Sequence, residues 1–282
     1  MDRNLIQRLI TGTLFVGVLV FAIWWHAWSY AALFLLITIL GLLEFYRLIR
    51  LTGASPQVFT GVATAMLVYA GVYGLYEFTY ELQLALPLAL LLTFIIFIIE
   101  LFRGSAMPFE NIGATILGVI YVALPFAFWH TAAFDTLNNI NTGKLETYYN
   151  YRYMLGFFII LWTSDSLAYV CGRLFGKHKL FERISPKKTW EGFIGGVVFT
   201  IAASWLVGEY IGGLQHIHWM VIGGIVAITG TLGDLVESMF KRRIGVKDSG
   251  TWLPGHGGIL DRFDAVLISS PFVVMYILAV QR

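Results

Sequence analysis

The strongest constraint on this chain is a series of nine apolar segments, each about 17 to 22 residues long and so able to cross a bilayer as a helix. They span Leu5–Trp24, Tyr30–Ile49, Val58–Tyr76, Leu82–Leu101, Ile112–Trp129, Tyr153–Cys171, Trp190–Ile211, Trp219–Val236 and Asp264–Val280. Of the 282 residues, 58% are hydrophobic and 13% are charged, against about 25% charged in a typical soluble domain. The sequence therefore predicts an all-α, polytopic integral membrane protein with about nine transmembrane helices.

Lysine and arginine are distributed unevenly between the connections. If the N-terminus lies inside, sixteen of the 19 basic residues fall on the inner side, and only Lys144, Arg152 and Arg282 fall outside. The positive-inside rule then predicts a cytoplasmic N-terminus. The first segment lacks a small-residue cleavage site, so we expect it to be an anchor. We expect three regions: N-terminal helices 1–5 in residues 1–130, an outer loop in 131–152, and a catalytic region with helices 6–9 in 153–282.

The stretch from Gly233 to Ala265 is unusually polar for such a chain. Its carboxylates are Asp234, Glu237, Asp261 and Asp264, and its cations include Lys241, Arg242, Lys247 and Arg262. Carboxylate oxygens suit Mg²⁺, and Lys and Arg suit phosphate. The turn Pro254-Gly255-His256-Gly257-Gly258 lets backbone N–H groups approach an anion closely. These residue types predict a site for a divalent cation and a polyphosphate.

Two blocks of this sequence resemble a known family. The first is Ser238-x-x-Lys241-Arg242, then Lys247-Asp248-x-Gly250, then the run from Leu253 to Asp264; the second is Ser185-Pro186-Lys187-Lys188-Thr189-Trp190-Glu191-Gly192. Together they resemble the phosphatidate cytidylyltransferase (CDP-diacylglycerol synthase) family. A motif with so many polar types in fixed order is far more specific than a lone glycine-rich loop.

The resemblance implies an Mg²⁺-dependent nucleotidyltransferase of phospholipid biosynthesis. It implies transfer of the cytidylyl group of CTP to phosphatidate, with CDP-diacylglycerol and pyrophosphate as products. The expected location is the bacterial cytoplasmic (inner) membrane, with the active site facing the cytoplasm. CTP, phosphatidate and membrane lipids are the expected partners; the net charge of +2 does not support nucleic acid. A homodimer is compatible with the resemblance.

Roles for the site residues follow from the same resemblance. Asp234 and Asp261 are expected to bind Mg²⁺ directly, with Asp264 and Glu237 as a further ligand or support. A second cation is plausible, because four acidic groups exceed what one Mg²⁺ usually takes from protein. The phosphates of CTP are assigned to Lys241, Arg242, Lys247 and Arg262, and the lipid phosphate or pyrophosphate to Lys187 and Lys188. The remaining substrate-binding residues are Asp248, His256, Gly257 and Gly258, and the catalytic group is Asp234, Asp261, Lys241 and Lys247.

Other interpretations stay open. The acceptor could be another lipid phosphate or a polyprenol. An ion-coupled transporter could use Asp165, Asp234 and Glu237 as a relay, although the expected internal repeat is not apparent. Asp165 could instead form a polar contact between helices.

Several residues outside the polar stretch have structural interpretations. Glu44 and Glu100 precede Arg47 and Arg103 by three residues, a spacing that favours helical ion pairs. Gly192 and Gly196 suggest close helix packing. His130 is expected at the membrane interface.

Overall fold

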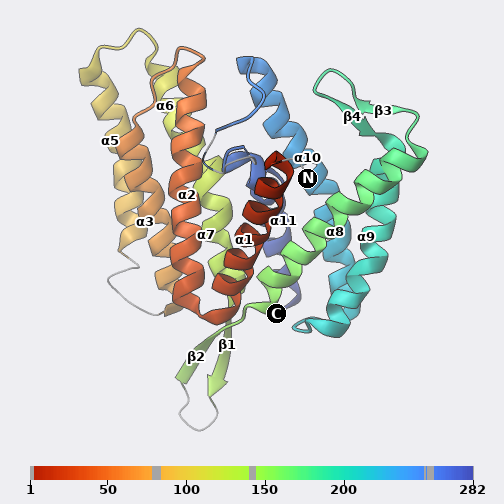
Figure 1. Cartoon of the computed structure of the whole chain (residues 1–282). Helices are drawn as coiled ribbons and strands as arrows, with labels where there is room; N and C mark the ends of the chain where they lie inside the picture. The colour runs from red at the N-terminus through yellow and green to blue at the C-terminus, as the bar shows by residue number, and fades with distance from the viewer. Residues whose placement is uncertain (1–2, 78–83, 140–143, 251, 253–256, 282) are drawn as a thin grey trace. The chain divides into compact units, whose positions relative to one another are not determined.

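The computed structural model describes residues 3–77, 84–139, 144–250, 252 and 257–281 (Figure 1). The contacts between residues divide the chain into two compact units. The first unit is Met1–Tyr149 with Val246–Arg262, and the second unit is Asn150–Gly245 with Phe263–Arg282. The division into 1–130, 131–152 and 153–282 stays a prediction.

The first unit is a group of apolar helices. Helix α3 packs against α5, α7 and α2, and α2 also packs against α1. The elements are α1 (Arg3–Trp25), α2 (Ala27–Arg50), α3 (Val58–Glu77), α5 (Ala85–Arg103), α6 (Pro108–Gly118), the π-helical turn η1 (Val119–Ala123) and α7 (Leu124–Ala133). The π turn ends two residues before Pro125. Proline has no N–H and would clash with the carbonyl four residues earlier in a regular α-helix.

An antiparallel hairpin occupies the region expected to be an outer loop. Strand β1 (Phe134–Asn139) pairs with β2 (Lys144–Tyr149). The Tyr149 hydroxyl donates to the carbonyl of Ile23 at 2.6 Å. The hairpin therefore ends in a side chain that ties it to α1.

His130, which we expect at the membrane interface, has a side chain that is fully buried within the first unit. Its ring lies edge-on to Tyr69, Tyr73 and Tyr30, with centroid distances of 4.4, 5.2 and 5.4 Å. Three tyrosine rings of the first unit therefore surround the imidazole.

The second unit contains α8 (Arg152–Phe175), α9 (Trp190–Tyr210), α10 (His216–Ile244) and most of α11 (Leu260–Val280). Helices α8, α9 and α10 pack against one another. The closeness expected at Gly192 is confirmed: a Cβ added there would lie 2.9 Å from the Ala168 carbonyl oxygen and from the Gly172 Cα. Small residues on both helices thus let the two backbones meet.

Helix α10 runs on to Ile244 instead of ending near Val236. Three basic residues, Lys241 to Arg243, lie in its last turn. Cations are favourable at the negative end of a helix dipole. The helix ends at Gly245, whose φ of 78° is the left-handed conformation that glycine adopts without a steric cost.

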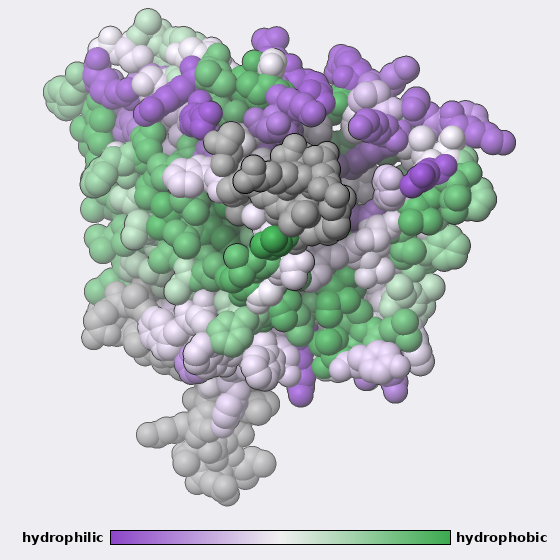
Figure 2. Space-filling model, in the orientation of Figure 1, coloured by the Kyte–Doolittle hydropathy of each residue, from purple (hydrophilic) through white to green (hydrophobic). Residues whose placement is uncertain are grey.

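The helices confirm an all-α, polytopic membrane protein. Among the described residues, eight helices are long and apolar enough to cross a bilayer, and Ile10–Trp25 is a shorter apolar stretch. In the second unit, hydrophilic residues gather at the end that carries β3 (Lys179–Phe181) and β4 (Ser185–Thr189), whereas the flank of α9 is hydrophobic (Figure 2). On the face shown, the hydrophilic residues of this unit are thus most abundant at one end of its helices.

Candidate functional site

Three carboxylates of the second unit converge. Oxygens of Asp234, Glu237 and Asp264 lie within 4.8 Å of one another. Asp234 and Glu237 share a face of α10 because they are three residues apart. Asp264 comes from α11, which approaches α10 so closely at Gly233 that an added Cβ would lie 2.6 Å from the Asp264 carbonyl oxygen. The glycine is therefore what allows the two helices to bring these acids together.

Two lysines balance part of this negative charge. The Lys188 ammonium lies 2.5 Å from an Asp234 oxygen, and the Lys241 ammonium lies 2.5 Å from a Glu237 oxygen. The Lys241–Glu237 pair is largely buried, with side-chain exposures of 12% and 4%. Buried charges of opposite sign stabilise one another only when they are closely paired, as they are here.

The donor set of this cluster fits a hard divalent cation. All three ligating groups offer carboxylate oxygens, which are what Mg²⁺ prefers. The adjacent ammonium groups are of the kind that bind phosphate oxygens. The arrangement can therefore hold a cation and an anionic phosphate side by side.

Asp165 on α8 belongs to the same electrostatic group. The charges of Lys188 and Asp234 act on its carboxylate, and its own charge acts on Asp264. The sequence alone allows this residue either a functional role or a polar contact between helices. A carboxylate within an apolar span was the signal that pointed to it.

The two lysines of β4 face in different directions. Lys187 and Lys188 are adjacent on β4, so they point to opposite faces of the strand. Lys188 reaches Asp234, whereas Lys187 is exposed. The preceding turn is held by Glu191, which accepts from the backbone N–H groups of Lys177 and His178 at 3.0 and 3.2 Å. The α9 terminus thereby fixes the hairpin.

A further contact to the hairpin comes from α10. The Arg242 side chain is exposed, and its Nε donates to the carbonyl of Ile184 at 3.5 Å. Arg242 is thus placed next to the basic hairpin and one residue after Lys241.

The other predicted residues lie in the first unit, on the segment 246–262 (the signature loop). The Asp261 carboxylate accepts from the backbone N–H groups of Ser249 and Gly258, both at 2.9 Å. Gly257 has a φ of 84°, and a Cβ there would lie 2.7 Å from an Asp261 oxygen. Asp261 thus closes a tight turn that needs glycine. Predicted residues exposed on this loop are Lys247, Asp248 and Arg262; the predicted residue His256 lies outside the described residues.

Glu44 of α2 holds the same loop. Its side chain is buried, and one carboxylate oxygen accepts from the Ser249 hydroxyl at 3.1 Å and from the Leu260 N–H at 2.9 Å. The expected pairing with Arg47 is wrong: Arg47 is exposed, and within the described part of the chain no ion pair joins the two.

The matching expectation for Glu100 is confirmed. Arg103 lies 2.9 Å from its carboxylate, which also accepts from Asn111 at 2.6 Å and from Gln57 at 2.9 Å. Glu100 therefore joins α5 to its neighbours within the first unit.

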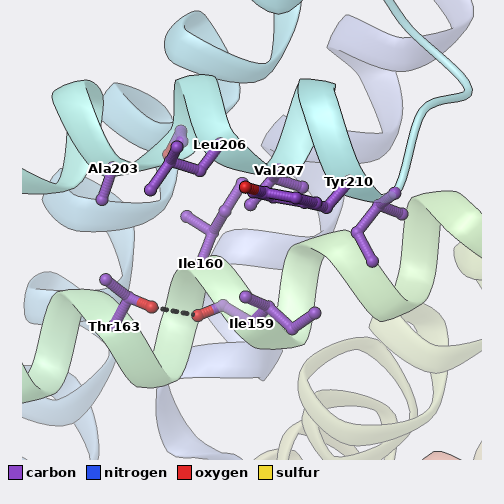
Figure 3. Close-up of a pocket in the computed structure, with 9 residues that line it drawn as sticks. Ile159, Ile160, Thr163, Ala203, Leu206, Val207 and Tyr210 are labelled. Carbon is purple, nitrogen blue, oxygen red and sulfur yellow. Dashed lines mark hydrogen bonds between the residues drawn. The ribbon is translucent and has the colours of Figure 1, made fainter.

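An apolar cavity of about 290 Å³ lies between α8 and α9 of the second unit (Figure 3). Of its three hydroxyl groups, those of Thr163 and Ser204 already donate within their own helices, to the carbonyls of Ile159 and Thr200, both at 2.7 Å. The third belongs to Tyr210 of α9. Leu206, Val207 and other apolar side chains complete the lining. The cavity thus has no charged group to bind a phosphate.

Comparison with known proteins gives a consistent result. A family model described as "Cytidylyltransferase family" matches residues 6–280. The phosphatidate cytidylyltransferase of Bacillus subtilis (strain 168) is 32% identical over 273 residues, or 95% of each chain. The phosphatidate cytidylyltransferase of Staphylococcus haemolyticus (strain JCSC1435) is 34% identical over 219 residues, or 77% of each chain.

Proposed function

Because the chain belongs to the cytidylyltransferase family, we propose that it transfers the cytidylyl group of CTP to phosphatidate, giving CDP-diacylglycerol and pyrophosphate. The observation that carries the proposal is the cluster of Asp234, Glu237 and Asp264 with Lys188 and Lys241, built within a unit of apolar helices. Relatives that share most of the chain are named for this reaction.

The reaction joins two anions. A phosphate oxygen of phosphatidate forms a bond to the α-phosphorus of CTP, and the bond from that phosphorus to the oxygen bridging it to the β-phosphate breaks. The electron pair of the broken bond leaves with pyrophosphate. The attacking oxygen is already ionised at neutral pH, so no general base is required. The protein must therefore screen like charges, align the two phosphates and stabilise the leaving group.

The acidic cluster is the proposed cation site. Asp234, Glu237 and Asp264 would hold Mg²⁺, which when bound supplies positive charge to the reacting phosphates. Asp261 remains a proposed ligand, and a second cation remains a proposal. Asp165, which acts electrostatically on this group, would tune its charge from α8.

The cationic residues are the proposed phosphate site. Lys188 and Lys241 each contact a cluster carboxylate, so each could exchange that carboxylate for a phosphate oxygen when substrate arrives. Arg242, Lys247 and Arg262 are proposed for CTP, and Lys187 for the lipid phosphate or pyrophosphate. Proposed contacts from the signature loop are Asp248, His256, Gly257 and Gly258.

The cellular setting is also a proposal. The sixteen-to-three distribution of basic residues supports an N-terminus and an active site that face the cytoplasm across the inner membrane. The last turn of α10, with Lys241 to Arg243, lies at the same end as the acidic cluster. A homodimer remains a prediction. The transporter interpretation is not favoured, because the relatives are named as enzymes.

The direct test is incorporation of label from CTP into lipid by the purified protein. With α-labelled CTP, Mg²⁺ and phosphatidate, label should enter the chloroform-soluble fraction, and pyrophosphate should appear in equal amount. Omission of phosphatidate or addition of EDTA should abolish both. A parallel reaction with a polyprenyl phosphate distinguishes the alternative acceptor. No incorporation with either lipid, in protein that remains folded, would refute the proposal.

A further inference from the structure

Glu44 is a buried carboxylate that contacts the signature loop from a distant part of the sequence. Its partners Ser249 and Leu260 are 205 and 216 positions away. On the basis of the proposed function, we infer that Glu44 is a positioning residue. Through these two hydrogen bonds it sets the geometry in which the signature loop binds the phosphates of CTP.

The loop is shaped around this carboxylate. A Cβ added to Gly258 would lie 2.5 Å from one Glu44 oxygen and 2.6 Å from the other, and a Cβ on Gly250 would collide with Glu44 as well. Both glycines are buried. Since such close approach is possible only without a side chain, these glycines provide the room that the carboxylate occupies.

The hydrogen bonds form a continuous path from Glu44 to a predicted ligand. The Ser249 hydroxyl donates a hydrogen bond to the Glu44 carboxylate, and the Ser249 backbone N–H donates to the Asp261 carboxylate at 2.9 Å. The Ser249 Oγ also accepts from the Asp261 N–H at 3.3 Å. Leu260, the second partner of Glu44, directly precedes Asp261. Glu44 thus contacts both Ser249, which bonds to Asp261, and Leu260, which precedes Asp261 in the chain.

Placing a carboxylate in this buried space costs free energy. A buried charge costs free energy unless it is well hydrogen-bonded, and an apolar side chain of similar size often stabilises a protein more. Both hydrogen bonds fall on one Glu44 oxygen; the other has no hydrogen-bond partner among the described residues. What the carboxylate does supply is a double acceptor aimed at the loop that carries Lys247, Asp248, Asp261 and Arg262.

Glutamine is the informative substitution. In Glu44→Gln the amide oxygen can accept both hydrogen bonds only if the NH₂ group takes the position of the unpartnered oxygen, buried against Gly250 and Gly258. In the reverse orientation the NH₂ group faces the Leu260 N–H. Either arrangement weakens the hold on the loop and keeps the side-chain volume.

Glu100→Gln is the matched control. Glu100 is also a buried glutamate near the end of a first-unit helix. Its partners are Gln57, which directly precedes α3, Arg103 of α5 and Asn111 of α6, and none of them belongs to the signature loop. Both variants remove one buried charge. Glu100→Gln also removes the ion pair with Arg103, so a loss of stability alone should affect Glu100→Gln at least as much as Glu44→Gln.

The experiment measures KM for CTP, KM for phosphatidate and thermal unfolding in detergent for both variants. We expect Glu44→Gln to raise KM for CTP or lower kcat by about tenfold, with KM for phosphatidate within about twofold, whereas Glu100→Gln changes none of these more than about twofold. Ser249→Ala should resemble Glu44→Gln, and the double variant should be little worse than either, because both act through one contact. Equal kinetic effects of Glu44→Gln and Glu100→Gln, or additive effects of Glu44→Gln and Ser249→Ala, would overturn the inference.

Limited trypsin digestion separates this inference from the proposed function. Lys247 and Arg262 are exposed cleavage sites at the two ends of the loop. Glu44→Gln should be cut there faster than wild type, and Glu100→Gln should not. If the wild-type protein made no CDP-lipid, the proposed function would fail while this comparison still tested the hold on the loop. Unchanged cleavage in Glu44→Gln would reject the inference even in an active enzyme.

Discussion

Lys188 and Lys187 show how much two adjacent, identical side chains can differ. Lys188 contacts Asp234, while Lys187 is exposed on the opposite face of β4. We expect Lys188→Ala to lower kcat/KM at least about tenfold more than Lys187→Ala, because a fixed charge near the reacting phosphates contributes more than a solvated one. Rates of CDP-lipid synthesis check this, with Lys179→Ala on β3 as the control. Equal losses at positions 187 and 188 would show that the hairpin acts only through its net charge.

The acidic cluster gives a second prediction for single residues. Asn keeps the shape of Asp but removes the charge that a hard cation needs, so Asp234→Asn and Asp264→Asn should each lower turnover roughly 10²–10³-fold. The double variant should be barely worse than either, because both would serve one cation. Mg²⁺ titrations of the rate should show a weaker apparent affinity in each single variant.

Glu209→Gln is the control for the cluster. Glu209 lies at the other end of α9, where its carboxylate is 3.5 Å from His216. It should retain near wild-type turnover. A strong loss in Glu209→Gln, with Asp264→Asn still active, would contradict the placement of the site.

At this scale the sequence was informative wherever the chemistry is local. The spacing of Asp234 and Glu237 was enough to place both on one face, and the structure adds Asp264 to them. It was misleading at Glu44, because an acidic residue three positions before an arginine looks the same whether it pairs with that arginine or with a loop far along the chain. Nothing in the quoted motif marks Ser249, which is the unspecified residue of Lys247-Asp248-x-Gly250.

Among the elements, α8 and α9 are joined most closely. Gly192 lies against Ala168 and Gly172, so Gly192→Ala should force the backbones apart and cost about 1–3 kcal/mol, as overpacking usually does. Thermal unfolding in detergent measures the loss. Thr189, three residues before Gly192, caps α9 by accepting a hydrogen bond from the Gly192 N–H. The activity of Gly192→Ala should therefore fall together with its stability.

Gly113→Ala is the matched control for that substitution. Gly113 is also a glycine within a helix, but a Cβ there would meet nothing within 4 Å. Alanine is the better helix former by up to about 1 kcal/mol. Gly113→Ala should therefore leave the unfolding temperature unchanged or higher, and an equal loss in both variants would argue against close packing at Gly192.

Element types were predictable from the apolar segments, but several boundaries were not. The apolar segment ends near Val236, so hydropathy could not show that α10 continues through Lys241 to Ile244. The charge of that last turn suits a helix end and an inner loop equally well. The hairpins of residues 134–149 and 179–189 were missed, because short polar strands have no hydrophobic alternation to mark them.

The topology prediction concerns the whole molecule. Single cysteines at positions 144 and 179, in a Cys171→Ser background, should react from opposite sides of the membrane, because nine spans place the two connections on opposite faces. The natural Cys171 is buried and is the one cysteine in the sequence. Labelling with a membrane-impermeant maleimide in sealed cells should reach position 144 only, until the membrane is opened. Reaction of both sites in sealed cells would rule out this arrangement.

The path of the chain between its two units limits how such proteins can be recombined. It leaves the second unit after Gly245, contributes residues 246–262 to the first, and returns at Phe263. A chimera made by exchanging residues 1–149 with those of a relative would join a foreign α2 to a native signature loop. Functional hybrids should therefore need two exchanged segments, 1–149 and 246–262, and a single crossover near Tyr149 should succeed only between parents whose loops are already compatible.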